Sequence, residues 1–221
     1  LIGVAITDGE QQIMLFSNEG KAIRFAETDV RSMGRSAKGV RGMRVTIGAS
    51  QVEETEENDV DVEDEDNSDS VVISRIVSLV VVPETGEVLC ASEHGYGKRT
   101  PVDDFPTKKR GGKGVIALKT SERNGELIGA VSIDASKELM LISDGGTLVR
   151  TRASEVAQTG RNAQGVRLIR LSNDELLVGV VSVDAVEDEE LEAIDVVENT
   201  EVEAITSEEV SSEPKDDTTE E

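Results

Sequence analysis

The chain has 221 residues, a formal net charge of -23, 2% aromatic residues and one cysteine. This length suits one or two domains, and a lone cysteine excludes an internal disulfide, which fits a reducing cytoplasm. The longest apolar run, about residues 73–82, is too short to cross a bilayer, and no signal peptide opens the chain. Because the chain starts inside an apolar run and not with methionine, we interpret it as a fragment of a longer protein.

Residues 1–50 predict a first unit made of β-strands. An apolar strand, LIGVAI, opens it, and two more strands follow around the glycine turn SNEGK. Glycine suits the positive φ of a tight hairpin. A loop with the string GRSAKG and a further strand complete the unit.

Residues 51–70 hold eleven acidic residues and no basic one. A segment this charged, with few large apolar side chains, buries too little surface to offset the entropy of ordering. We therefore expect a disordered acidic insert between the first and second units.

Residues 71–120 and 121–183 predict two more units on the same plan. Segment 13–45 realigns without a gap on 139–171, and a middle copy covers 88–120. The glycine turns of these copies are SEHGYGK and SDGGT, and the apolar strands IVSLVV and LIGAVS precede them. A fourth apolar strand, LVGVVS at residue 177, has no copy after it, and we expect it to complete a blade that begins elsewhere.

Residues 184–221 form a second acidic segment, with seventeen acidic residues and one basic. We expect a disordered tail that is solvated; the alternative is a short amphipathic segment that folds against a partner or against the body. Without the insert and the tail, the remaining residues carry a net charge of +4. The folded body is therefore mildly basic.

A strand-rich repeat near fifty residues predicts an all-β, propeller-like fold made of four-stranded blades. A β-solenoid is the alternative, but its repeats are usually shorter. Three copies and a spare strand do not close a ring, so we expect a partial ring whose N-terminal half is missing.

The three copies resemble consecutive blades of the C-terminal domain of the DNA gyrase A subunit. The strings that carry the resemblance are GEQQIMLFSNEGKAIRFAETDVRSMGRSAKGVRGMRV, GYGKRTPVDDFPTKKRGGKGVIALK and GTLVRTRASEVAQTGRNAQGVRLIRL. The resemblance covers about residues 1–183 and implies a β-pinwheel, in which blades exchange strands and DNA wraps around the outer rim. Six blades are usual, so the chain would hold roughly the last three.

The same resemblance implies the partners and the setting. It implies binding of duplex DNA with little sequence preference, and the gyrase B protein as partner in an A2B2 heterotetramer of a bacterial, cytoplasmic and nucleoid-associated type IIA topoisomerase. ATP and Mg²⁺ would serve the holoenzyme, which introduces negative supercoils, while this fragment would carry no cofactor and no catalytic residue. The family cleaves DNA through a tyrosine of another domain, so we interpret Tyr96 as a structural hairpin residue.

One loop resembles the family's hallmark box, glutamine-arginine-arginine-glycine-glycine-lysine-glycine. Residues 108–114, KKRGGKG, match five of its seven positions, and Lys108 and Lys109 replace the first two. Lysine and arginine contact phosphates, and glycines let backbone N–H groups approach an anion. The plainer interpretation is a solvated basic loop.

The predicted DNA contacts are basic residues of the hairpins and loops. They are Arg24, Arg35, Lys38, Arg41, Lys98, Arg99, Lys108, Lys109, Arg110, Lys113, Arg150, Arg152, Arg161 and Arg167. Arg24, Arg99 and Arg150 share one repeat position, and strand alternation places them on the outer side. Stacking between blades is the alternative for these three.

Two other functions stay open from the sequence: the C-terminal domain of the topoisomerase IV A subunit, and a protein-binding propeller. No G-x-x-x-x-G-K-[ST] motif indicates an ATP site. Cys90 and His94 are too few for a metal site, and the acidic runs lack the pattern of a calcium loop.

Overall fold

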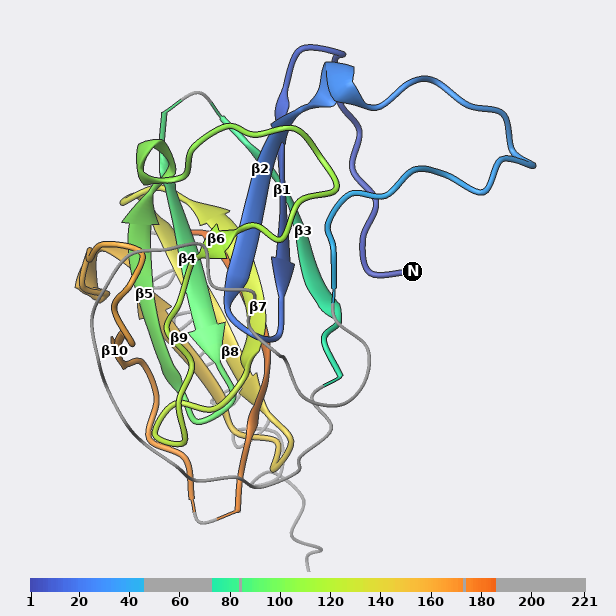
Figure 1. Ribbon diagram of the computed structural model, residues 1–221. Coiled ribbons are helices and arrows are strands. Elements are labelled where there is room, and N and C mark those ends of the chain that lie inside the picture. The colour runs from blue at the N-terminus through green and yellow to red at the C-terminus, as the bar shows by residue number, and fades with distance from the viewer. Residues whose placement is uncertain (46–72, 84, 173, 186–221) are drawn as a thin grey trace, which may run out of the picture. The chain divides into compact units, whose positions relative to one another are not determined.

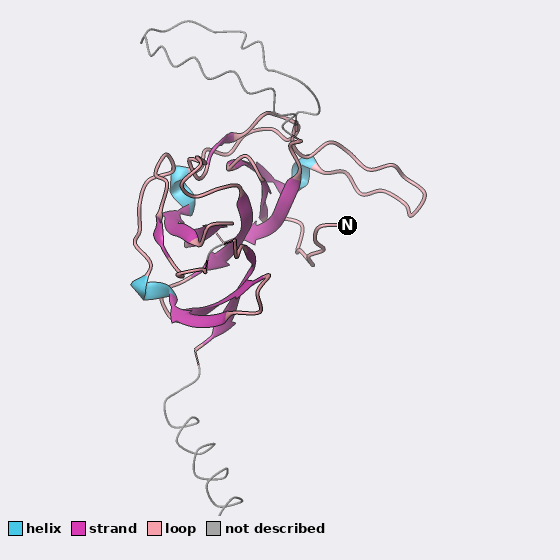
Figure 2. Cartoon of the chain, turned by 90° about the horizontal axis from the view of Figure 1, so that it is seen from below, coloured by secondary structure: helices cyan, strands magenta, loops and turns pink. Residues whose placement is uncertain are grey.

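The computed structural model describes residues 1–45, 73–83, 85–172 and 174–185. In these ranges the regular structure consists of β-strands and three 3₁₀ turns, shown in magenta and cyan in Figure 2. The all-β prediction is confirmed. The predicted acidic insert at 51–70 and all but the first two residues of the predicted tail lie outside the described residues.

Antiparallel strands form three sheets, one for each copy (Figure 1). The first has the order β3-β1-β2-β6, with β1 (Gln12–Ser17), β2 (Lys21–Ala26), β3 (Ile76–Val82) and β6 (Val115–Ile116). The second has the order β10-β5-β4-β7, with β4 (Glu87–Ser92), β5 (Tyr96–Pro101), β7 (Leu127–Ile133) and β10 (Val166–Arg167). The third has the order β11-β8-β9, with β8 (Lys137–Ser143), β9 (Leu148–Arg152) and β11 (Leu177–Asp184).

Each apolar strand completes the sheet of the copy that precedes it. β3 pairs with β1, β7 pairs with β4, and β11 lies beside β8. The prediction that these strands open the copy that follows them was wrong, as was the assignment of LVGVVS to a blade that begins elsewhere. Residues 1–6, the other predicted apolar strand, form no strand and are exposed. Alternation of side chains identifies a strand, but it does not say which neighbour the strand pairs with.

The fourth strand of a blade comes from the next copy. Val115 pairs with Ala22 at the edge of the first sheet, and Val166 pairs with Gly97 at the edge of the second. The third sheet has no such strand among the described residues. This exchange of strands between blades defines a pinwheel.

The hydrophobic core lies between neighbouring sheets. Met14, Phe16 and Phe105 are buried between the first and second blades, and the two phenyl rings meet edge to face at 6.4 Å. Leu89 and Leu141 are buried in the corresponding cluster between the second and third blades. Burying a side chain of this size stabilises the fold by about 1.5–3 kcal/mol, so each blade depends on its neighbour.

Candidate nucleic-acid interface

The loop at residues 108–114 lies on the first blade and is held there by its backbone. Lys108 N donates to Arg24 O at 2.8 Å and Gly111 N donates to Gly42 O at 2.5 Å. Gly112 O in turn accepts from Arg44 N at 2.8 Å. The loop leads directly into β6, the exchanged edge strand. Its position on the preceding blade is thus determined before any ligand binds.

Gly114 ends this loop where no other residue fits easily. Its φ is +83°, and a Cβ there would lie 2.5 Å from Ala22 O. Gly165, at the same place in the third copy, has φ +86° and would bring a Cβ within 2.6 Å of Gly97 O. These glycines let the loop cross closely over the strand of the preceding blade. Packing therefore explains them without a bound anion.

Three of the four cations of the loop are free among the described residues. Lys108, Lys109 and Lys113 are exposed, and no described carboxylate lies within 4.0 Å of them. Arg110 differs because its guanidinium donates to Asp29 O at 2.9 Å and to Arg41 O at 3.0 Å. The lysines present charge outward, while Arg110 ties the loop to the first copy.

Five other residues that the sequence predicts as DNA contacts differ in how exposed their side chains are. Arg35, Lys38 and Arg41 are exposed on the long blue segment after β2 that extends from the sheets in Figure 1. Arg161 is half-buried and donates to Ile116 O at 3.1 Å. Arg152 is exposed at the end of β9. The described structure therefore leaves four of these five side chains accessible to solvent.

Lys98 is fully buried, so its assignment as a DNA contact was wrong. Its ammonium donates to Gly160 O at 2.6 Å, Arg161 O at 2.8 Å and Thr100 Oγ1 at 3.2 Å. Burial lowers the pKa of Lys98 to about 8. The side chain thus fastens the 160–161 segment of the third copy to the second blade.

The shared arginine position links blades, as the stacking alternative predicted. Arg24 Nη1 donates to Val102 O at 2.9 Å and to Phe105 O at 3.2 Å, both in the next copy. Arg99 Nε donates to Val156 O at 2.8 Å. The expected outer, free orientation was wrong for these two residues. Alternation fixes the face of a strand, but the next copy covers that face here.

Arg150 occupies the same repeat position in the third blade and is exposed. It pairs with Glu138 of the neighbouring strand and bonds to no carbonyl of another described blade. Arg99 also has such a pair, with Glu87 at 2.6 Å, in addition to its carbonyl bonds. Arg99 and Arg150 therefore differ mainly in that Arg99 also donates hydrogen bonds to the copy that follows it, whereas Arg150 has no such bond among the described residues.

This difference predicts unequal costs of the same substitution. Arg99→Lys should lower the free energy of unfolding by about 1–2 kcal/mol, because lysine lacks the fork that bonds Glu87 and the carbonyls together. Arg150→Lys should change it by less than about 0.5 kcal/mol, as expected for an exposed pair. Urea unfolding of both variants measures this, and equal costs would contradict the linking role.

Sequence reasoning missed Arg123 and Arg170, which lie near Tyr96 together with Arg167. Tyr96 is a buried hairpin residue at the start of β5, and it accepts a hydrogen bond from Arg167. Arg123 sits in a turn without periodic pattern, so no local signal marks it. Arg170 occupies the same repeat position as Arg44 and Lys119, and this recurrent basic position was the signal that could have found it. In the described part of the chain, no three His, Cys, Asp or Glu side chains gather as a metal site. Nor does any helix there have the length and apolar character needed to cross a membrane.

Strand-exchanged blades with a cationic loop at an exchanged edge define a β-pinwheel with a basic surface. The family model described as DNA gyrase C-terminal domain, beta-propeller, matches residues 11–58, 86–134 and 137–184. The chain belongs to this family.

Named relatives agree with this membership. The DNA gyrase A subunit of Haemophilus influenzae is 50% identical over 198 residues, 87% of this chain and 22% of the relative. The Escherichia coli K12 protein of the same name is 43% identical over 219 residues, 98% of this chain and 22% of the relative. The chain thus spans about a fifth of the length of these relatives.

Two solved structures share the fold. The DNA gyrase A C-terminal domain superposes with a TM-score of 0.64 at 26% identity, covering 80% of this chain and 52% of that one. The C-terminal domain of DNA topoisomerase IV gives 0.66 at 21% identity, over 89% and 54%. The second likeness concerns the fold alone.

Proposed function

We propose that this chain binds and wraps duplex DNA as the C-terminal part of the DNA gyrase A subunit. The observation that carries the proposal is the loop at 108–114, which presents Lys108, Lys109 and Lys113 to solvent from a fixed backbone. Family membership favours the same function.

The chemistry of the loop suits contact with phosphates and not with bases. Lysine ammonium groups act as point charges toward phosphate oxygens. Most of the binding free energy then comes from released counterions, which depends on salt and little on sequence. Because the loop lies on the preceding blade, successive blades would offer successive contacts to a bent duplex.

The activity of the whole protein is part of the proposal. We propose that the gyrase A and B proteins join in an A2B2 heterotetramer, in which ATP and Mg²⁺ serve sites outside this chain. Negative supercoiling would use the DNA wrapped here, and the cleavage chemistry would come from other domains of a type IIA topoisomerase. The bacterial relatives support a bacterial, cytoplasmic, nucleoid-associated setting.

The double substitution Lys109→Gln/Lys113→Gln tests the loop. We expect weaker binding of unrelated 40-base-pair duplexes by a similar factor. The log–log salt slope should fall by about 0.9 for each phosphate that the loop no longer neutralises. Fluorescence anisotropy at several salt concentrations measures both quantities.

The control Arg75→Gln/Lys137→Gln removes the same charge ahead of β3 and at the start of β8. It should lower the affinity slightly and leave the slope close to that of the parent, since neither residue belongs to the proposed DNA path. If the two double variants behave alike, the loop is not part of that path. If the parent does not bind duplex DNA, the proposed function itself fails.

A further inference from the structure

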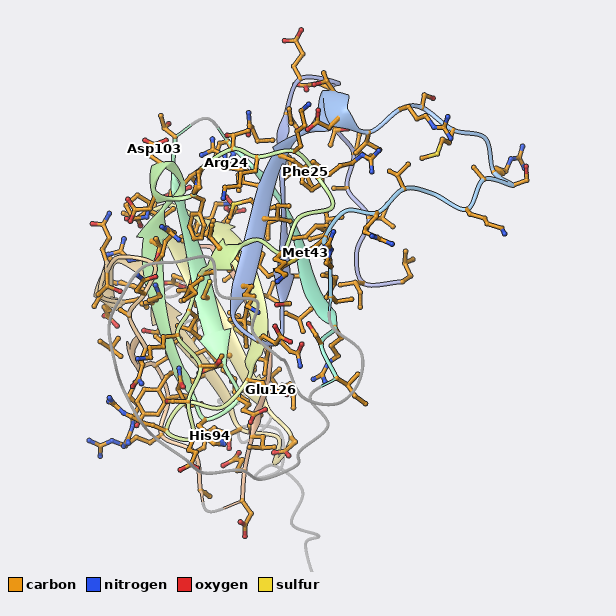
Figure 3. All side chains as sticks on the ribbon, in the orientation of Figure 1. Arg24, Phe25, Met43, His94, Asp103 and Glu126 are labelled. Carbon is orange, nitrogen blue, oxygen red and sulfur yellow. The ribbon has the colours of Figure 1, made fainter. Side chains whose placement is uncertain are left out.

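A basic cavity lies at the turn between β4 and β5 of the second blade. Its volume is about 410 Å³, and its lining includes His94, Tyr96, Arg123, Arg167 and Arg170. His94, labelled in Figure 3, marks this end of the blade. The volume falls in the range of small-ligand pockets.

The strands and turns hold the cationic residues in place. Arg167 belongs to the exchanged strand β10, where it pairs directly with Tyr96 of β5. Arg123 lies in a turn that the fully buried Asn124 closes, because Asn124 Oδ1 accepts a hydrogen bond from Ser121 N at 2.8 Å. Asn124 Nδ2 also donates to Gln164 O at 3.2 Å, which joins this turn to the third copy.

Two guanidinium groups face the tyrosine. The Cζ atoms of Arg123 and Arg167 lie 4.8 Å and 5.4 Å from the ring centroid of Tyr96. Arg167 Nη2 also donates to the phenol oxygen at 2.9 Å. Hydrogen bonds from Arg167 and Arg123 lower the pKa of Tyr96 below its usual value. The environment of the ring therefore favours negative charge.

The lining of the cavity has three arginines and two acidic residues, so its net charge is positive. No described carboxylate lies within 4.0 Å of the guanidinium of Arg123, Arg167 or Arg170. Glu175 also lines the cavity, but it accepts from the Ser143 hydroxyl and from Ser172 N. The bond from the Ser143 hydroxyl, together with further hydrogen bonds, lowers the pKa of Glu175 to about 2. Asp174 is the other acidic group on the wall.

We propose that this cavity binds a phosphate group, and that the group is a phosphodiester of duplex DNA held along the exchanged strands. The inference rests on the proposed function and adds a second anchor one blade beyond the loop at 108–114. Strand β10 has the same place in the second blade as β6, which follows that loop, has in the first. Arginine is well suited to this ligand because its donors match the oxygens of a phosphate.

The anchor belongs to the second blade alone among the described blades. In the first blade, Lys21 and Ile116 occupy the paired positions of Tyr96 and Arg167. An isoleucine there supplies no charge and no donor. The third sheet has no exchanged strand in the described residues.

Tyr96 makes a direct measurement feasible because the chain has one tyrosine and no tryptophan. Labelling with [¹³Cζ]tyrosine gives a single resonance from the cavity of the full chain. We expect this resonance to shift on addition of a 40-base-pair duplex, and to shift at far higher concentration with inorganic phosphate at constant ionic strength. A shift with the duplex alone also supports the proposal.

Other outcomes overturn it. If anisotropy shows that the duplex binds but the resonance does not move, the cavity is not an anchor, and the proposed function stands. If phosphate moves the resonance and the bound duplex does not, the cavity takes a free anion. If no duplex binds at all, the proposed function fails first.

A charge test accompanies the spectrum. Arg123→Gln/Arg170→Gln keeps the bond between Arg167 and Tyr96, and should lower the salt slope of duplex binding by about 0.9 for each phosphate no longer neutralised. The affinity deficit should therefore shrink about threefold per phosphate when salt rises fourfold. Arg123→Lys/Arg170→Lys should restore the slope. A slope equal to that of Arg75→Gln/Lys137→Gln overturns the inference.

Discussion

Gly114→Ala is expected to lower the free energy of unfolding by about 2–4 kcal/mol. Two effects add: the residue has φ +83°, and its new Cβ would lie 2.5 Å from Ala22 O. A backbone carbonyl cannot rotate away as a side chain can, so β6 or β2 must shift. Urea unfolding measures the decrease, and weaker duplex binding should accompany it because the shift moves the loop at 108–114.

Gly39→Ala is the matched control. Gly39 holds the same repeat position with φ +78°, but nothing lies within 4 Å of its Cβ position. Only the cost of the left-handed backbone remains, about 1–2 kcal/mol. Equal decreases for the two variants would show that backbone conformation, and not the close approach between blades, requires the glycine.

Lys98→Ala is expected to destabilise the fold by about 3 kcal/mol, because the substitution removes a fully buried side chain and its hydrogen bonds to two carbonyls. The carbonyls are Gly160 O and Arg161 O. Lys98→Met keeps most of the volume and should cost less than the alanine. If both variants unfold at the parental urea midpoint, the ammonium does not fasten the third copy to the second blade.

The pH dependence of stability offers a second measurement on Lys98. Its folded pKa is about 8, below the usual 10.5, so the unfolded chain binds more protons between these values and stability rises with pH there. Burial raises the pKa of the Cys90 thiol from 9.0 to about 12, which makes stability fall above pH 9. Between pH 8 and 9 the parent should therefore gain stability relative to Lys98→Met. A constant difference over this window would contradict the lowered pKa.

Most strands and hairpin turns of the described residues follow from the sequence alone, although residues 1–6, which the sequence predicts as a strand, form none. Alternating apolar residues marked the strands, and Gly20, Gly95 and Gly146 adopt the positive φ that the hairpin turns predicted. These features depend on residues that are close together in the sequence. Because the pattern of strands and turns recurs about every fifty residues, the sequence also predicted the blades. The basic loop at 108–114 could also be recognised from the sequence, because its charged residues and glycines are close together in the chain.

How the copies interlock is decided only in the tertiary structure. The sequence predicts a strand after the loop of each unit, and β6 and β10 form there, but it does not predict their partners, which lie about 70–95 residues away along the chain in the preceding blade. The same interlocking buries Lys98, which aligns with Ile23 of the first copy and donates its hydrogen bonds to a later loop. It also brings Arg123 and Arg167 to one tyrosine. Whether these side chains are buried, and which charged groups lie next to them, depends on pairing between segments that are far apart in the sequence, because those segments fold over them.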